Sequence, residues 1–344
     1  MNKLCIFFLF LLVSHLSSAA QAIGHAPIGV MADHTHKKGE SMISLRLSYL
    51  KMKGNKLSGN DISEEDILNI SNPLSNSPAN LSIVPKDMSM RMLMIGGMYA
   101  PSDKLTIMAM AMFMEKQMNL NSYHGMSRNY LGSFSTSNED LSDISFSVLI
   151  NLQELEKSRW HLEVGLNKSI GSEAKQALVL TPMNTQIHML MPYGMQTGDK
   201  SLRYVVSLTN SYSYSDDILF GNQIRLIKAI DERIWSFGDK ASYDSWFQYS
   251  INDNFSISTR LNINLQKKIN GNNSSLVSPV QTANPENYGG NIANLGLGLN
   301  FLTKTTSNNP DRLAVELLTP IYQDKKGLQM KDKGELIFGY QKSF

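Results

Sequence analysis

The chain has 344 residues, of which 42% are hydrophobic and 18% are charged, and its formal net charge at pH 7 is +2. A net charge this close to zero excludes the strongly basic surface of a nucleic-acid-binding protein. The charged fraction lies below the usual share of about a quarter, which favours a protein whose surface is partly out of contact with water.

The first 22 residues have the pattern of a secretory signal peptide. Lys3 provides a positive start, residues 6–13 form a short apolar core, and residues 20–22 (AQA) offer small side chains for cleavage. The apolar core is too short to span a bilayer. The single cysteine, Cys5, lies inside this segment, so we expect the exported protein to have no disulfide.

The next segment, residues 23–40, is a short leader rich in histidine and lysine. A His-x-His pattern on an extended chain places both imidazoles on one side. Imidazole, carboxylate and thioether groups together can hold copper or zinc. The alternative is a polar leader or plug that hydrogen-bonds in the periplasmic mouth of a barrel. The candidate metal ligands are His25, Met31, Asp33, His34 and His36.

From residue 41 to residue 344 the chain repeats segments of about ten residues in which apolar and polar side chains alternate. A period of two indicates β-strands, and short turns alternating with long loops are typical of an outer-membrane barrel. We therefore predict an all-β fold, a transmembrane antiparallel β-barrel of about twelve strands. The predicted strands are 41–52, 87–99, 104–115, 141–152, 160–171, 201–214, 218–228, 241–251, 255–267, 291–302, 312–322 and 334–344.

Two neighbouring predicted strands carry methionine at every second position. Thr106 shares this face, whereas Leu105, Ile107 and Phe113 share the other, so we expect the methionines to point into the lumen. Thioethers are adaptable partners for apolar solutes and soft ligands for copper, and close packing without any ligand is the third alternative. The inward methionines are Met90, Met92, Met94, Met98, Met108, Met110, Met112 and Met114.

Charged residues also share the inward parity. In a narrow pore such charges form salt bridges and set selectivity. The solute path is therefore expected to include Arg46, Arg203, Arg225, Arg260, Glu163 and Glu316, with Asp143 and Asp244 as further acidic partners.

The long loop 172–200 contains several methionines and His188. It can fold inward as a constriction, but the sequence favours an ordinary surface loop. No enzyme is predicted, because the chain has neither a G-x-S-x-G motif nor a P-loop. The chain ends on Phe344 after alternating aromatic residues, which resembles the signal that barrel-assembly machinery recognises.

Three stretches are similar to one bacterial family, the outer-membrane transporters grouped with the meta-pathway phenol-degradation (MetA-like) proteins. They are residues 26–39 (APIGVMADHTHKKG), 98–106 (MYAPSDKLT) and 191–196 (MPYGMQ). The family usually has glycine at Ala32 and often proline at Gly194, and its Gly-Ser-Gly-Thr run is TGDK here, at 197–200. The resemblance implies a barrel that passes small molecules, with some association with metal handling.

These observations predict an outer-membrane channel for small, apolar or aromatic solutes through a methionine-lined lumen. The alternatives are a copper-binding envelope protein that uses the leader and the methionines, and a structural barrel without transport. The expected partners are outer-membrane lipid, a small-molecule solute and the barrel-assembly machinery, with no nucleic acid.

Overall fold

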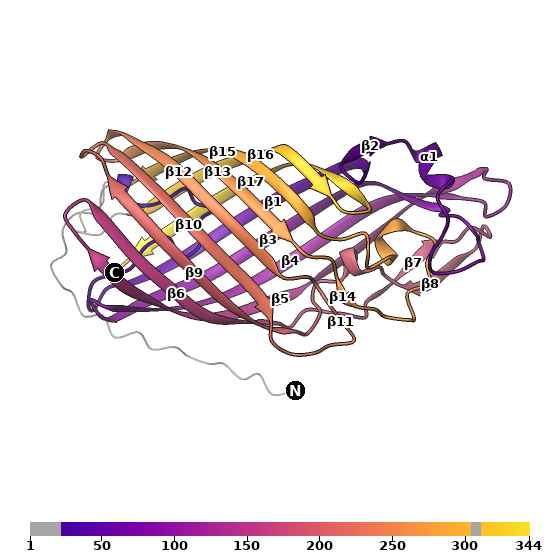
Figure 1. The fold of residues 1–344 in the computed structure, drawn as a ribbon, viewed down its shortest axis with the longest axis horizontal. Helices are drawn as coiled ribbons and strands as arrows, with labels where there is room; N and C mark the ends of the chain where they lie inside the picture. The colour runs from indigo at the N-terminus through magenta and orange to yellow at the C-terminus, as the bar shows by residue number, and fades with distance from the viewer. Residues whose placement is uncertain (1–21, 304–310) are drawn as a thin grey trace.

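The structure, a computed structural model, describes residues 22–303 and 311–344. Residues 1–21 of the predicted signal peptide, with Cys5, lie outside the described residues. Within the described residues, twelve long strands form one closed antiparallel barrel, and the last strand pairs with the first (Figure 1). The barrel strands are β1 (Ser41–Leu57), β3 (Ile83–Ser102), β4 (Leu105–Tyr123), β5 (Tyr130–Glu154), β6 (Ser158–Ser169), β9 (Leu202–Ser213), β10 (Ile218–Ala229), β12 (Lys240–Asn252), β13 (Phe255–Gln266), β15 (Gly290–Leu302), β16 (Arg312–Lys325) and β17 (Leu328–Ser343).

The shorter elements gather at the end of the barrel opposite the C-terminus (Figure 1). There the hairpin of β7 and β8 and the pair of β11 and β14 form two small sheets. This is therefore the end with the long loops. The bounds are β2 (Asn60–Ile62), α1 (Glu64–Leu68), β7 (Gln176–Leu180), β8 (Gln186–Leu190), η2 (Tyr193–Met195), β11 (Trp235–Ser236), β14 (Asn270–Gly271) and η3 (Gln281–Ala283); one further turn, η1 (Ala22–Gly24), opens the leader.

The all-β barrel prediction is confirmed, and each predicted strand lies in or across an observed one. The predicted strands 104–115 and 141–152 leave residues 116–140 as a loop. This prediction is wrong, because β4 continues to Tyr123 and β5 already begins at Tyr130. Polar side chains on both faces suggested a loop. In the structure they bond across the strands: Asn119 donates to Asp87 (2.7 Å), and Ser135 donates to Asn119 (2.6 Å). A strand that extends into water beyond the membrane needs no apolar face.

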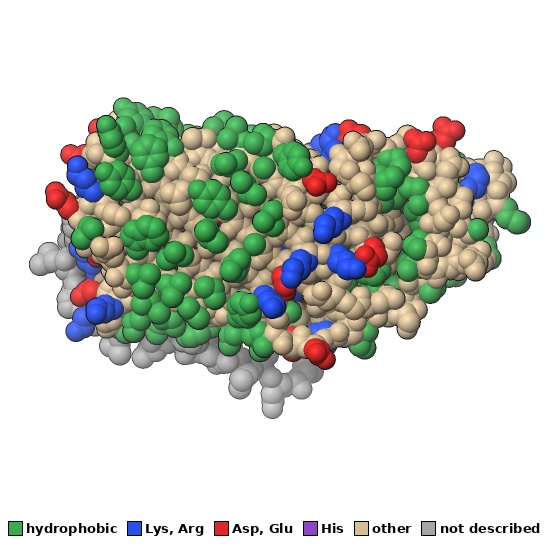
Figure 2. All heavy atoms as spheres, in the orientation of Figure 1, with side chains coloured by type: hydrophobic (Ala, Val, Ile, Leu, Met, Phe, Trp, Pro, Cys, Tyr) green, Lys and Arg blue, Asp and Glu red, His purple; other side chains and the backbone are tan. Residues whose placement is uncertain are grey.

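The outer wall of the barrel is apolar. On every barrel strand the outward-facing positions carry large hydrophobic side chains, such as Ile95 at 52% exposure and Leu297 at 63%. Figure 2 shows these side chains spread over the barrel, with charged side chains gathered toward its two ends. An apolar band between two charged rims is the surface of a transmembrane barrel. No helix among the described residues is long and apolar enough to cross a membrane.

The leader, residues 23–40, runs inside the barrel at the short-turn end. Its apolar side chains pack against three parts of the inner wall. Ile23, Ala26 and Val30 contact Leu219 and Trp246; Ile28 contacts Ala314, Leu318 and Ile337; Ala32 contacts Met42, Met98, Met108 and Leu149.

Glycine is needed where the leader crosses the inner wall most closely. A Cβ on Gly29 would lie 2.3 Å from Arg260 Nη2 and 2.8 Å from Glu316 Oε2. The absence of a side chain at this position therefore lets the leader lie directly on the charged side chains of β13 and β16.

Candidate functional site: a methionine-lined chamber

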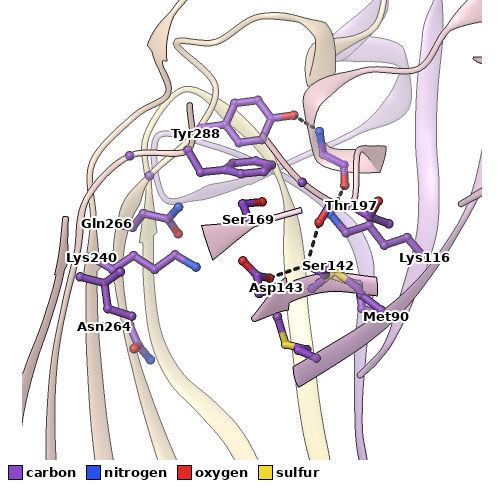
Figure 3. A pocket seen from close by; sticks show the side chains of 18 of the residues that line it. Met90, Lys116, Ser142, Asp143, Ser169, Thr197, Lys240, Asn264, Gln266 and Tyr288 are labelled. Carbon is purple, nitrogen blue, oxygen red and sulfur yellow. Dashed lines mark hydrogen bonds between the residues drawn. The ribbon is translucent and has the colours of Figure 1, made fainter. Parts of the chain in front are cut away.

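A chamber of about 520 Å³ lies inside the barrel. One wall carries the methionines of β3 and β4, and the facing wall carries charged and polar side chains from β9 to β13. Figure 3 shows Lys240 of the facing wall pointing toward Asp143 of β5. The methionines that line the chamber are Met88, Met90, Met94, Met110, Met112, Met114 and Met118, with Met52 from β1, Met330 from β17 and Met31 from the leader.

The period of two in β3 and β4 and their register bring the methionines together. Met94 lies opposite Met112, and Met98 opposite Met108, while Leu93 and Phe113 pair on the other face. Antiparallel neighbours on one face lie about 4.5–5.5 Å apart at Cβ, so the sulfurs form a continuous patch. Two of the predicted inward methionines, Met98 and Met108, do not line the chamber and pack instead near Ala32 of the leader. Met92 lies on the same face, partly buried, but is not among the chamber-lining residues.

The roof of the chamber is the segment 191–199, which folds into the barrel mouth. Met191, Tyr193 and Met195 are almost completely buried. Lys116 Nζ of β4 donates to the carbonyls of Gly194 (3.0 Å) and Gln196 (2.6 Å). This part of the loop is thus held by a buried ammonium group.

The roof corrects the prediction of an ordinary surface loop over 172–200. Residues 174–190 do match that prediction, with many exposed side chains, such as Met183 (74% exposed) at the tip and His188. Loop sequences carry no periodicity, so the contact of Lys116 with residues 194 and 196 had no local signal. The one useful hint was the concentration of methionines in the loop.

The floor of the chamber is the leader, which the inner wall holds by hydrogen bonds to its backbone. Five side chains from four strands (β4, β6, β10 and β16) take part, so the leader is fixed on several sides of the barrel. The bonds are Ala32 O with His161 Nε2 (2.8 Å), Gln223 Nε2 to Met31 O (2.8 Å), Arg312 Nη2 to Ala26 O (2.5 Å), Gly29 N to Glu316 Oε2 (2.8 Å) and His36 N to Thr106 Oγ1 (3.0 Å).

The inward charges predicted from the sequence, apart from Arg46, form three separate groups. Arg260 lies between Asp244 (3.0 Å) and Glu316 (2.7 Å), and Arg225 contacts Glu163 (2.5 Å). In the third group, Arg203 lies between Asp143 (3.8 Å) and the roof residue Asp199. Arg46 faces the sulfur of Met31 instead of an acidic side chain. Most of the inward charge is therefore neutralised in place.

The candidate metal ligands of the leader are only partly brought together. The ligand atoms of His25, Asp33 and His34 lie within 4.8 Å of one another, and the rings of His34 and His36 lie 4.9 Å apart. The leader turns at Ala32, whose φ of 52° is left-handed. The sulfur of Met31 contacts Arg46 and faces the chamber, outside the group of three.

Electrostatics favour the metal-binding forms of His25, Asp33 and His36. Burial lowers the pKa of His25 well below its ordinary value, and the charge of Arg312 lowers it further. Burial also lowers the pKa of His36. For Asp33, burial alone would raise the pKa, but His34 and Arg312 hold it below its ordinary value. Neutral imidazoles and an ionised carboxylate are the protonation states that metal binding requires.

The barrel wall is interrupted beside the chamber. Backbone pairing between β16 and β17 ends at Leu318 and Glu335, although β16 runs to Lys325 and β17 starts at Leu328. Pro320 has no N–H to donate to a ladder, and Gly334 has a φ of 152°. Pro320 and Gly334 therefore account for the break in backbone pairing at the level of the sequence.

Side chains bridge the end of this break that lies nearest the long loops. Gln323 exchanges two hydrogen bonds with the backbone of Asp332 (2.9 and 3.0 Å), and Lys325 Nζ contacts its carboxylate (2.6 Å). A cavity of about 290 Å³ lies at the break. Its lining residues shared with the chamber are Lys240, Asn264, Gln266, Ile292 and Asp332. The chamber therefore adjoins the opening in the wall.

Comparison with known proteins supports the fold. No family model matches the chain, and no curated protein matches its sequence. An outer membrane channel from Pseudomonas putida F1 has a TM-score of 0.55 at 13% identity, over 92% of this chain and 100% of that chain. A FadL homologue from Pseudomonas aeruginosa has a TM-score of 0.42 at 8% identity, over 89% of this chain and 90% of that chain. The CymD monoaromatic hydrocarbon channel also has a TM-score of 0.42, at 9% identity, over 90% of this chain and 89% of that chain.

The first of these likenesses is high enough to establish a shared fold, that of an outer-membrane β-barrel. The other two are too low to add to it. The resemblance of three short stretches to the MetA-like transporter family stays a prediction.

Proposed function

We propose that the chain is an outer-membrane channel for small apolar or aromatic solutes, which it holds in the methionine-lined chamber. The observation that carries the proposal is the chamber itself, of about 520 Å³. Thioethers are polarisable and flexible, so a methionine wall adapts to apolar and aromatic shapes. A cavity of a few hundred cubic ångströms suits one small molecule.

The two ends of the chamber favour an apolar solute over a hydrated one. The leader occupies the short-turn end, and residues 191–199 fold into the other. A hydrophilic solute would need a continuous aqueous path along the barrel axis. An apolar solute can instead leave or enter through the break between β16 and β17, where the wall faces the acyl chains of the bilayer.

The location belongs to the same proposal. The sequence of residues 1–22 would direct export, and the terminal Phe344 would mark the chain for barrel-assembly machinery. The apolar outer wall then requires a lipid bilayer around it, because such a surface is unfavourable in water.

Uptake of a radiolabelled monoaromatic hydrocarbon by whole Gram-negative cells tests the proposal. The host should lack its own hydrocarbon channels and express this chain. A double variant, Met90→Gln with Met112→Gln, places two amides on the chamber wall, so we expect uptake to fall at least several-fold. The matched control is Met183→Gln, because Met183 is 74% exposed on the loop tip.

Two results would contradict the proposal. One is uptake by the wild type no faster than by cells without the chain. The other is equal uptake by the double variant, provided that gel mobility without heating shows a folded barrel.

A further inference from the structure

The leader contains an unusual concentration of buried nitrogen atoms without hydrogen-bond partners. They are His25 Nδ1, His36 Nε2 and both ring nitrogens of His34. A buried polar atom without a partner costs about 1–3 kcal/mol. His34 Nδ1 does lie 3.0 Å from Asp33 Oδ1, but this contact lacks hydrogen-bond geometry. Packing of the leader alone therefore leaves these atoms unexplained.

We propose that His25, Asp33 and His34 bind one divalent transition-metal ion, Cu²⁺ in preference to Zn²⁺. Their ligand atoms already lie within 4.8 Å of one another, so small rotations of the rings bring all three to one ion. Two imidazoles and a carboxylate form a donor set that suits both ions. The general order of divalent affinities places Cu²⁺ above Zn²⁺.

The carboxylate of the set is held in position. Asp33 Oδ2 accepts a hydrogen bond from the backbone N–H of Ala26 (3.0 Å), which leaves Oδ1 directed at His34. The side chain of Asp33 is 4% exposed and that of His34 17%. Such support is typical of metal sites, where neighbouring groups orient the ligands.

The positive charges nearest the cluster have other partners. Arg312 donates to Asn300, Gln341 and Ala26 O. Arg46 faces Met31. His36 stays just outside the set, with Nδ1 3.5 Å from the Glu40 carboxylate. The Asp33 carboxylate is therefore the anionic ligand, and no arginine side chain is directly bonded to it.

Metal binding would stabilise the floor of the chamber. All three ligands belong to the leader, and the ion would join residue 25 to residues 33 and 34. The backbone between them carries the contacts of Ala26, Gly29 and Met31 with the barrel wall. A ligand that binds the ordered leader shifts the equilibrium toward it. This inference does not depend on which solute passes the chamber.

Copper titration of the purified, folded protein tests the site. The protein should carry no polyhistidine tag and be treated with chelator before Cu²⁺ is added. We expect saturable binding of one ion per chain, with nitrogen couplings from imidazole in the electron paramagnetic resonance spectrum. Zn²⁺ should bind more weakly.

Two variants and one control locate the ion. His34→Ala removes a ligand, and Asp33→Asn removes the charge but keeps an acceptor for Ala26 N–H. Both should weaken Cu²⁺ binding at least tenfold, the loss seen when even supporting groups of metal sites are changed. His188→Ala, on the exposed face of β8, should bind as the wild type does. Absence of saturable binding by the wild type, or wild-type affinity in either variant, would overturn the proposal.

Discussion

Arg260 shows how a charge is tolerated inside this barrel. Its guanidinium lies between Asp244 and Glu316, and all three residues are at most 5% exposed. Arg260→Met would leave two buried carboxylates without their cation, so we expect the free energy of unfolding to fall by about 3–5 kcal/mol. Urea unfolding of the protein in detergent micelles measures this change.

The matched control for Arg260 is Arg91, which also lies on a barrel strand but has an exposed side chain. Arg91 contacts Glu115 at 3.3 Å with its side chain 61% exposed. Arg91→Met should cost at most about 1 kcal/mol. An equal loss of unfolding free energy in the two variants would show that burial does not determine how much the ion pairs of Arg260 contribute to stability.

Gly29 is the position where the leader has least room. A Cβ there would meet Arg260, Glu316 and Ile337 between 2.3 and 2.9 Å. We expect Gly29→Ala to cost about 1–3 kcal/mol by overpacking and to loosen the leader. Faster tryptic cleavage after Lys37 or Lys38 would report the loosening. Gly24→Ala is the control, because nothing lies within 4 Å of its Cβ, and it should be cleaved at the wild-type rate.

Among the elements, the roof segment 191–199 depends on one side chain of β4. Lys116→Met removes the donor to Gly194 O and Gln196 O while it keeps most of the volume. We expect the roof to open more often, so amide hydrogen exchange in residues 191–199 should become several-fold faster. Lys104→Met, in the exposed turn after β3, should leave the exchange of these amides unchanged. Equal exchange rates in the two variants would mean that Lys116 does not hold the roof.

Most of the sheet could be predicted from the sequence, because strand position depends on local alternation. The pattern in 255–266 predicted β13 within a residue, since Ile257 and Ile263 alternate with Ser258 and Asn264. The parity of Thr106 assigned the methionine face to the lumen side, and Met90 and Met112 do line the chamber.

The features that shape the site depend on contacts distant in sequence. Lys116 meets residues 194 and 196, and Gly29 meets residues 260 and 316. No periodicity reports such pairs. The break in the wall did have a signal, because Pro320 falls within a predicted strand, but one proline does not show which neighbour loses its pairing.

On the scale of the whole molecule, closure of the ring explains both surfaces. The first and last barrel strands meet, and Ser41 and Phe344 exchange two backbone hydrogen bonds (2.8 and 3.2 Å). A closed sheet has no free edge, so every strand can place an apolar face outward and a polar or methionine face inward. The break at β16 and β17 is thus a local exception in an otherwise complete ladder.

The tryptophans allow a direct test that lipid surrounds the outer wall. The chain has three: Trp160 is 37% exposed, on the outer face of β6, whereas Trp235 and Trp246 are each 3% exposed. Aromatic side chains of this kind lie at the membrane interface of barrels. In vesicles of brominated phospholipid, which quench fluorescence on contact, we expect quenching to come from Trp160 alone.

Trp160→Phe should therefore abolish the quenching by brominated lipid, and Trp235→Phe should leave it in place. Because the two substitutions remove the same chromophore, the difference depends only on which side of the wall it occupies. Quenching that survives Trp160→Phe would place lipid inside the barrel. A wild-type protein without any quenching would mean that the apolar wall faces another protein, since so large an apolar surface is not stable in water.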